Sequence, residues 1–266
     1  MTVIKCESCG LIFTNPQLTQ KDLTSHYDKN YYYSPQKDPK DNTRYFDYNA
    51  RYLKGKEKKR FIEIFENLKK LGLRTGKLLD VGCACGFFIE EANKKGWQAE
   101  GVEISKWAAL WGKKNLRVKI FNGELRQAKF RSADFDVVTF LDSFEHFRNP
   151  LIELKEAARI LKKGGLVYVE TINFDNPITR HLIGQKYVHM VPRLHLYYFG
   201  RKQIKNMLQK TGFQIMQMSL RSSSVGDYEY SGLGMYAKYL SLLLNPPKGY
   251  RNFALNDVIN IYARKN

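Results

Sequence analysis

Between residues 77 and 173 the sequence alternates short apolar runs with amphipathic segments of about ten residues. The apolar runs, which predict strands, are residues 77–81, 98–103, 117–121, 135–142 and 166–173. The intervening segments with helical spacing are residues 86–95, 105–115 and 149–164. Strands that alternate with helices of this length form βαβ units with right-handed crossovers. The sequence therefore predicts an α/β fold, a doubly wound parallel sheet with helices on both faces.

The flanking segments extend this pattern. A helix is predicted over residues 49–71, and Gly72 ends it. A further helix and strand follow at 201–212 and 213–220, then an irregular insert at about 221–255. The last strand, residues 257–265, is predicted to close the mostly parallel sheet as an antiparallel edge strand.

Composition narrows the class of protein. With 266 residues and 43% hydrophobic residues the chain can bury one sizeable core. No apolar run is long enough for a membrane span, and the N-terminus lacks the apolar core of a signal peptide, so a cytoplasmic location is expected. The net charge of +18 would suit an anionic partner. The lysines of the chain are scattered along the sequence, however, so specific nucleic-acid binding is not favoured.

The stretch "LLDVGCACGFF" is the most informative local feature. Asp80 ends a strand, and Gly82, Ala84 and Gly86 follow in alternation. Small residues let the backbone turn tightly, and the next helix points its N-terminal N–H groups at a ligand. In an open α/β sheet this turn lies where ligands bind. Cys83 and Cys85 are interpreted as small packing residues rather than metal ligands, and C-x-C lacks the spacing of a redox pair.

The loop does not match the dinucleotide fingerprint G-x-G-x-x-G, because Ala84 and Phe87 hold its second and third glycine positions. It resembles motif I of class I S-adenosylmethionine-dependent methyltransferases, D/E-x-G-x-G-x-G, with Ala84 at the middle glycine. The resemblance implies a Rossmann-like domain that binds S-adenosylmethionine. It also implies that Glu103, which ends the second strand, accepts hydrogen bonds from the ribose hydroxyls.

Later motifs extend the resemblance over roughly residues 1–220 and the last strand. "FDVVTFLDSFEHFRNP", "LKKGGLVYVETIN" and "HLYYFGRKQ" are similar to the family's following motifs. "NGE", residues 122–124, occupies the region that commonly meets the adenine amino group. The cofactor-binding residues implied by the resemblance are Asp80, Gly82, Cys83, Ala84, Gly86, Glu103, Ile104, Glu124 and Leu141.

The N-terminal "CESCG" resembles the second knuckle of a zinc ribbon in a bacterial subgroup of this family. The resemblance divides the chain into residues 1–48, a partial ribbon and tyrosine-rich lid, and residues 49–266, the methyltransferase domain. Cys6 and Cys9 would supply two of the four zinc ligands. The family's first C-x-x-C would precede Met1, so either the start codon is misplaced or the site has decayed.

Four tyrosines follow the knuckle, and they either form a lid over the cofactor or pack an N-terminal helix into the core. They are Tyr27, Tyr31, Tyr32 and Tyr33. The insert around 221–255 is expected to wall the acceptor pocket or pack as a helix, with contact to a membrane surface as the alternative.

Methyl transfer to a hydroxyl or amine is helped by a general base. His146 is the first candidate for this base, His195 the second, and Asp142 accompanies them. For both histidines the alternative is a structural role. Asp142, Glu145 and His146 would also lie on one helical face, where a divalent cation could bind.

The expected acceptor is a small molecule, a saccharide or a lipid-linked precursor, methylated on oxygen. An RNA methyltransferase is the alternative suggested by charge, although the "NPPY" motif of exocyclic-amine enzymes is missing after the fourth strand. The second alternative is a module that binds the cofactor without catalysing a reaction.

Overall fold

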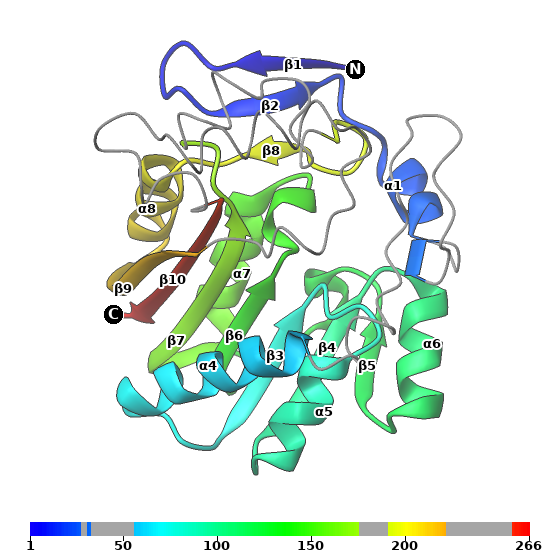
Figure 1. Ribbon diagram of the computed structural model, residues 1–266, viewed down its shortest axis with the longest axis vertical. Helices are drawn as coiled ribbons and strands as arrows, with labels where there is room; N and C mark the ends of the chain where they lie inside the picture. The colour runs from blue at the N-terminus through cyan, green and yellow to red at the C-terminus, as the bar shows by residue number, and fades with distance from the viewer. Residues whose placement is uncertain (28–30, 33–55, 176–190, 222–256) are drawn as a thin grey trace, which may run out of the picture.

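A computed structural model describes residues 1–27, 31–32, 56–175, 191–221 and 257–266 of the chain (Figure 1). Its main feature is a seven-stranded sheet in the order β5-β4-β3-β6-β7-β10-β9. The strands are β3 (Lys77–Val81), β4 (Gln98–Glu103), β5 (Lys119–Asn122), β6 (Phe135–Leu141), β7 (Leu161–Ile172), β9 (Phe213–Arg221) and β10 (Val258–Lys265). Strands β3 to β7 pair in parallel, whereas β10 runs antiparallel to both of its neighbours.

The predicted Rossmann-like, mostly parallel sheet is confirmed. The last strand is antiparallel, as predicted, but it lies between β7 and β9, so β9 holds the edge position. The burial of β10 explains its place, because six consecutive residues from Val258 to Ala263 are buried. A strand that is buried on both faces belongs inside a sheet rather than at its edge.

The helices cover both faces of the sheet. They are α4 (Lys56–Lys70), α5 (Phe87–Lys94), α6 (Lys106–Asn115), α7 (Pro150–Ile160) and α8 (Arg201–Lys210). One hydrophobic cluster joins α4, α5 and α6 to the sheet, and within it the rings of Phe65 and Phe88 stack at 5.1 Å. A second cluster on the opposite face joins α7 and α8 through Leu154, Leu208 and their neighbours.

Helix α7 is shorter than predicted. Asn149 caps its N-terminus and Pro150 begins it, as predicted, but the helix ends at Ile160 rather than near Gly164. Leu161 is fully buried and pairs with Phe135 of β6, so the chain leaves the helix to join the sheet. Gly164 then takes a left-handed conformation, φ +77°, inside β7.

The N-terminal residues form a separate small sheet. Strands β1 (Thr2–Lys5) and β2 (Ile12–Asn15) pair antiparallel, and β2 also pairs with β8 (Tyr197–Tyr198). Figure 1 shows this sheet beyond the carboxyl ends of β6 and β7, with helix α1 (Gln20–His26) beside it. Most of the predicted lid segment and insert, together with residues 49–55 of the first predicted helix, lie outside the described residues.

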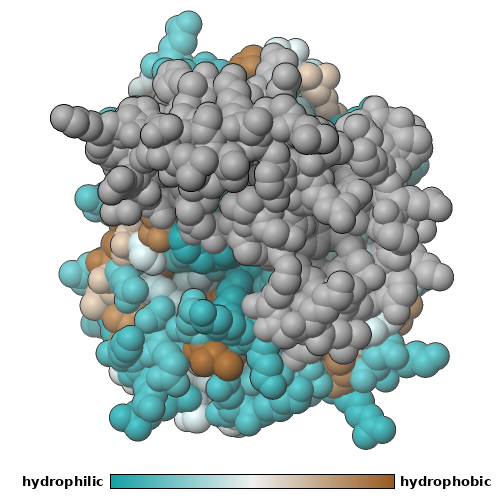
Figure 2. Space-filling model, viewed as in Figure 1, coloured by the Kyte–Doolittle hydropathy of each residue, from teal (hydrophilic) through white to brown (hydrophobic). Residues whose placement is uncertain are grey.

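The surface of the described residues is mainly hydrophilic over α4 and α5 (Figure 2). Across all the described residues, the large hydrophobic side chains that are exposed come from different elements: Met1, Ile62, Leu110, Phe121 and Met216. Among the helices that the structure describes, none is both long enough and apolar enough to cross a bilayer.

Gly112 on α6 tests how closely the helix packs on the loop after β3. A Cβ atom at this position would lie 2.4 Å from the carbonyl oxygen of Cys85 and 2.8 Å from Cδ1 of Ile120. We expect Gly112→Ala to lower the free energy of unfolding by about 1–3 kcal/mol, the usual cost of overpacking. Urea unfolding measures this change in the free energy of unfolding. Lys113→Ala, a substitution at an exposed position, is the control and should be nearly neutral. Equal stability of Gly112→Ala and the wild type would contradict the close packing of α6 on the loop.

Candidate functional site

The loop between β3 and α5 turns through three residues with positive φ. Gly82 and Gly86 have φ values of +75° and +83°, and Ala84 between them has +50°. Glycine adopts this region freely, whereas alanine pays about 1–2 kcal/mol for it. Ala84 therefore adopts a backbone conformation that usually favours glycine, and a contact in the structure must stabilise it.

That hold comes from Glu103 at the end of β4. The Ala84 N–H donates to Oε2 of Glu103 at 2.9 Å, and the Ser105 N–H donates to Oε1 at 2.7 Å. The carboxylate is 4% exposed. Burial raises the pKa of Glu103, while the two amide donors act in the opposite direction. One carboxylate thus joins the loop to the first turn of α6.

Two of the tyrosines predicted as a lid lie against this carboxylate and the adjoining helix. The Tyr32 hydroxyl donates to Oε1 of Glu103 at 3.4 Å, and its ring stacks on Trp107 at 5.9 Å. The Ser105 hydroxyl donates to the carbonyl oxygen of Tyr27. Both tyrosines are also buried in the hydrophobic core cluster. Each of them therefore packs in the core and contacts the candidate site at the same time. Tyr33 lies outside the described residues.

Asp80 and Ser143 fasten the same loop to β6. The Thr139 hydroxyl donates to Oδ1 of Asp80 at 2.6 Å, and the Ser143 hydroxyl donates to the Val81 carbonyl at 2.7 Å. Burial raises the pKa of Asp80 to about 7, although the Thr139 hydrogen bond and the nearby Arg60 charge lower it. Ser143 had no distinguishing signal in the sequence.

The two loop cysteines are buried free thiols, in line with the packing role predicted for them. The Cys83 sulfur lies where a Cβ on Gly101 would approach it to 2.5 Å, so it fills the space that this glycine leaves. Burial raises the pKa of the Cys85 thiol to about 12. A thiol that resists ionisation is a poor nucleophile and metal ligand.

The remaining predicted cofactor residues lie at the carboxyl ends of neighbouring strands. Ile104 follows β4, and Leu141 ends β6; both are half-buried. Glu124 follows β5, and its N–H donates to Oε1 of Gln127 at 2.8 Å. All nine predicted cofactor residues therefore lie along one edge of the sheet, at the ends of β3 to β6.

Asp142 forms an ion pair with Arg60, a residue that the sequence did not single out. A nitrogen of Arg60 on α4 lies 2.8 Å from Oδ2 of Asp142 and 2.7 Å from Oε1 of Glu170. Arg221 pairs with Glu170 as well. Arg60 lies in the basic run "KGKEKKR". The only local sign that its side chain faces the protein is its spacing of four residues from Ile64, which is buried on the same helix.

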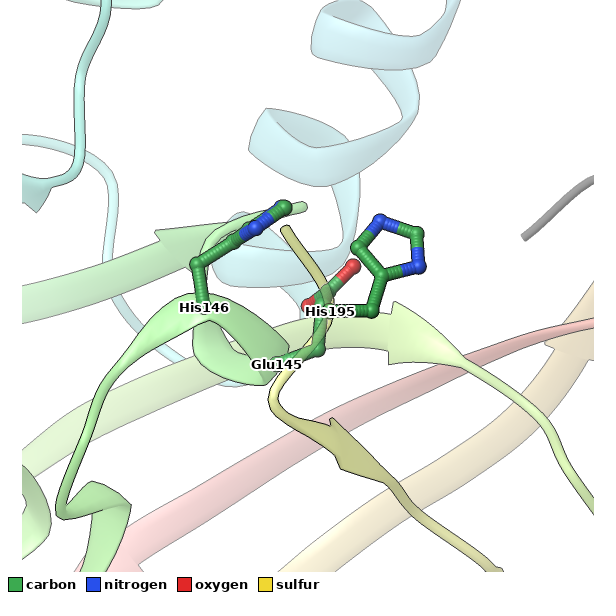
Figure 3. Close-up of side chains that lie close together, drawn as sticks. All are labelled: Glu145, His146 and His195. Atoms are coloured by element: carbon green, nitrogen blue, oxygen red, sulfur yellow. The ribbon is translucent and has the colours of Figure 1, made fainter. Parts of the chain in front are cut away.

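Glu145, His146 and His195 meet instead (Figure 3). The prediction that Asp142, Glu145 and His146 share a helical face is wrong, because Asp142 precedes the short 3-10 helix η2 (Phe144–His146) with a φ of +47°. His195, from the segment before β8, completes the cluster. Its ring centre lies 4.8 Å from that of His146.

Buried polar contacts fix the orientation of this cluster. The Thr171 hydroxyl donates to Oε2 of Glu145 at 2.7 Å. Nδ1 of His146 lies 2.9 Å from both the Leu194 carbonyl oxygen and the Tyr27 hydroxyl. Burial raises the pKa of Glu145 to about 7, against the effect of the His195 charge, and burial lowers the pKa of His146.

Cys6 and Cys9 form a turn between β1 and β2. The Gly10 N–H donates to the Cys6 carbonyl at 2.9 Å, and hydrogen bonds, with the Ser8 side chain first, lower the pKa of the Cys6 thiol to about 7. Within the described ranges no third His, Cys, Asp or Glu ligand joins these two thiols in a cluster. Zinc binding by this turn stays a prediction.

Comparison with known proteins identifies the family. A family model described as a methyltransferase domain matches residues 51–218. The ubiquinone biosynthesis O-methyltransferase of Acinetobacter baumannii is 31% identical over 132 residues, covering 46% of this chain and 55% of that protein. The protein of the same name from Pseudomonas fluorescens is 31% identical over 134 residues, covering 47% and 57%. The chain thus spans little more than half the length of these relatives.

Solved structures share the fold. An S-adenosylmethionine-dependent methyltransferase from Archaeoglobus fulgidus has a TM-score of 0.58 at 17% identity, covering 81% of this chain and 94% of that one. Phosphoethanolamine N-methyltransferase 2 of Haemonchus contortus, solved with S-adenosyl-L-methionine, has a TM-score of 0.57 at 20% identity, covering 78% and 52%.

The burial of Asp80 predicts that its contribution to the stability of the protein depends on pH. Its folded-state pKa is raised from 3.8 to about 7, so the wild type loses stability as pH rises through this range, at about 1.4 kcal/mol per pH unit. Asp80→Asn keeps an oxygen for Thr139 and removes the charge. We therefore expect its stability relative to the wild type to be greater at pH 8 than at pH 5.5, by about 2 kcal/mol.

Urea unfolding at the two pH values measures this difference. The control is Asp134→Asn, which alters a carboxylate that is 29% exposed and paired with Lys77. An Asp80→Asn variant whose stability relative to the wild type is the same at both pH values would show that Asp80 titrates as an ordinary solvated carboxyl group.

Proposed function

The chain belongs to the S-adenosylmethionine-dependent methyltransferase family, and from this premise we propose that it methylates an oxygen atom of a small-molecule, saccharide or lipid-linked acceptor. The observation that carries the proposal is the position of His146 and His195 beyond the end of β6. Ser143, three residues before His146, donates to the carbonyl of Val81, the residue that precedes the Glu103-held loop. Tyr27 covers His146 from the N-terminal segment. The relatives from Acinetobacter baumannii and Pseudomonas fluorescens are named O-methyltransferases of ubiquinone biosynthesis, which supports an oxygen acceptor.

The residues at the sheet edge fit the cofactor. S-adenosylmethionine supplies a methyl group bonded to a positively charged sulfur. Gly86 is the N-cap residue of helix α5 and has no side chain to cap it, so the first N–H groups of the helix remain available toward the loop. We assign the ribose to Glu103, and the adenine side to Ile104, Glu124 and Leu141. Asp80, Gly82, Cys83 and Ala84 would shape the loop around the remainder.

His146 is the group that we assign as general base. The Leu194 carbonyl can only accept, so it fixes the proton of His146 on Nδ1 and leaves the lone pair on Nε2. Burial lowers the pKa of His146, which keeps the imidazole neutral at neutral pH. His195 is the second candidate. Asp142 is less suited because the Arg60 guanidinium beside it stabilises its charged form.

We also infer the division of labour along the chain. Residues 49–266 would form the methyltransferase domain, with the insert near 221–255 in it, and residues 1–48 would cover the site. The pairing of β2 with β8 and the contacts of Tyr27 and Tyr32 support a covering role for the N-terminal part.

The cofactor assignment predicts the effect of Glu103→Ala. We expect its affinity for S-adenosylmethionine to fall by at least about tenfold, because the loop amide and the ribose hydroxyls both lose their acceptor. Isothermal titration calorimetry with S-adenosylmethionine, S-adenosylhomocysteine and NAD measures this. Glu100→Ala, three residues earlier on β4, is the matched control. Undiminished affinity in Glu103→Ala, or binding of NAD alone, would overturn the assignment.

The base assignment predicts the effect of His146→Gln. Release of S-adenosylhomocysteine is first measured with a panel of phenols, saccharides and polyprenyl phosphates to find the best acceptor. With that acceptor, His146→Gln should lower kcat by about 10²–10⁴-fold while the affinity for S-adenosylmethionine is unchanged. In the wild type, kcat should hold as pH falls through 6.5, because the pKa of His146 is lowered. A fully active variant would exclude His146.

A further inference from the structure

We propose that Glu145, His146 and His195 form a binding site for a divalent transition-metal ion of the Zn²⁺ type. Each residue offers one ligand atom, and these atoms all lie within 4.8 Å of one another. Figure 3 shows the two imidazole rings on either side of the Glu145 carboxylate. Two imidazoles and one carboxylate are a donor set that Zn²⁺ and its neighbours bind in catalytic sites.

The spacing suits an ion after a small closure. Zn²⁺ binds nitrogen and carboxylate oxygen at about 2.0–2.2 Å, which places tetrahedral ligand atoms roughly 3.4 Å apart. The three side chains come from only two segments, η2 and the residues before β8. The Leu196 N–H donates to the Glu145 carbonyl at 2.9 Å, so these segments are joined directly. Small side-chain rotations on this fixed backbone would bring the ligand atoms into range.

The contacts behind two of the three residues, His146 and Glu145, are those of an outer ligand shell. The Leu194 carbonyl accepts from Nδ1 of His146, which leaves Nε2 for an ion, and the Thr171 hydroxyl holds Oε2 of Glu145 and leaves Oε1. Metal-binding histidines almost always donate their other N–H to such an acceptor. The same orientation exists here in the protein alone.

The charges of the neighbourhood also favour a cation. Glu145 is 2% exposed. Among the ion pairs of the described residues, arginines neutralise Asp142 and Glu170, but none of the pairs with Lys or Arg involves Glu145. Among the described residues, His195 is the positive charge that acts on Glu145. A bound ion would interact favourably with the carboxylate and accept the lone pairs of both histidines.

The role of the ion rests on the proposed function, whereas its binding does not. Three protein ligands leave a coordination position open, and an acceptor hydroxyl bound there would lose its proton to solvent water more readily. His146 would then hold the ion instead of taking the proton itself. A chelator separates these two roles. It should abolish activity if His146 holds the ion, and it should leave activity unchanged if His146 takes the proton itself.

The test is a titration with Co²⁺, whose visible absorption reports coordination, in full-length protein that carries Cys6→Ser and Cys9→Ser to remove the other thiol ligands. We expect saturable binding of one Co²⁺ per chain, displaced by Zn²⁺. Separate Glu145→Gln, His146→Asn and His195→Asn substitutions should each weaken Co²⁺ binding by at least about tenfold, as loss of even an outer-shell partner does. His26→Asn, the same change on α1, should not.

Thr171→Val keeps all three ligands and removes only the hydroxyl that orients Glu145. It should weaken Co²⁺ binding by about tenfold, and it provides a test even where a ligand substitution prevents folding. Absence of a Co²⁺ spectrum in the starting protein, or equal affinity in all of these variants, would overturn the metal site. Neither result depends on S-adenosylmethionine or an acceptor, so failure of the proposed function would be seen separately.

Discussion

The buried carboxylate of Glu103 is the contact on which the arrangement of the sheet edge depends. It accepts from the Ala84 N–H in the loop and from the Ser105 N–H before α6, and the Tyr32 hydroxyl reaches it from the N-terminal part. Three segments distant in sequence are therefore set relative to one another by two oxygen atoms. The positive φ of Ala84 persists because this acceptor compensates for its strain.

Three acidic residues near the carboxyl ends of β6 and β7, Asp142, Glu145 and Glu170, differ in the cations beside them. Arg60 and Arg221 neutralise Asp142 and Glu170 on the side of β7, where the Tyr168 hydroxyl also donates to Glu170 at 2.6 Å. Glu145 has histidines beside it instead. Guanidinium groups stay charged at all ordinary pH values, whereas imidazoles exchange protons near neutrality. Asp142 and Glu170 are therefore suited to holding the structure, and Glu145 is suited to chemistry.

The sequence predicted the parts of the structure that depend on local pattern. Strand and helix alternation determined the sheet, and Ser105 and Asn149 cap their helices as the sequence indicated. Contacts across the chain could not be predicted in this way. The position of β10 inside the sheet and the early end of α7 at Leu161 are decided by pairing partners far away. Arg60 was missed because an arginine that is largely covered by the fold and one that is fully exposed have the same local sequence in a lysine-rich run.

The strand β2 has its second partner, β8, more than 180 residues further along the chain, and the Thr14 N–H donates to the Leu196 carbonyl at 3.0 Å. During synthesis on the ribosome the amino-terminal arm therefore emerges first and docks late. Until residues near 197 have been made, one edge of β2 lacks its partner and is open to pairing with other chains. Because its contacts are so far apart in the sequence, we expect this small sheet to close after the locally connected βαβ units have formed.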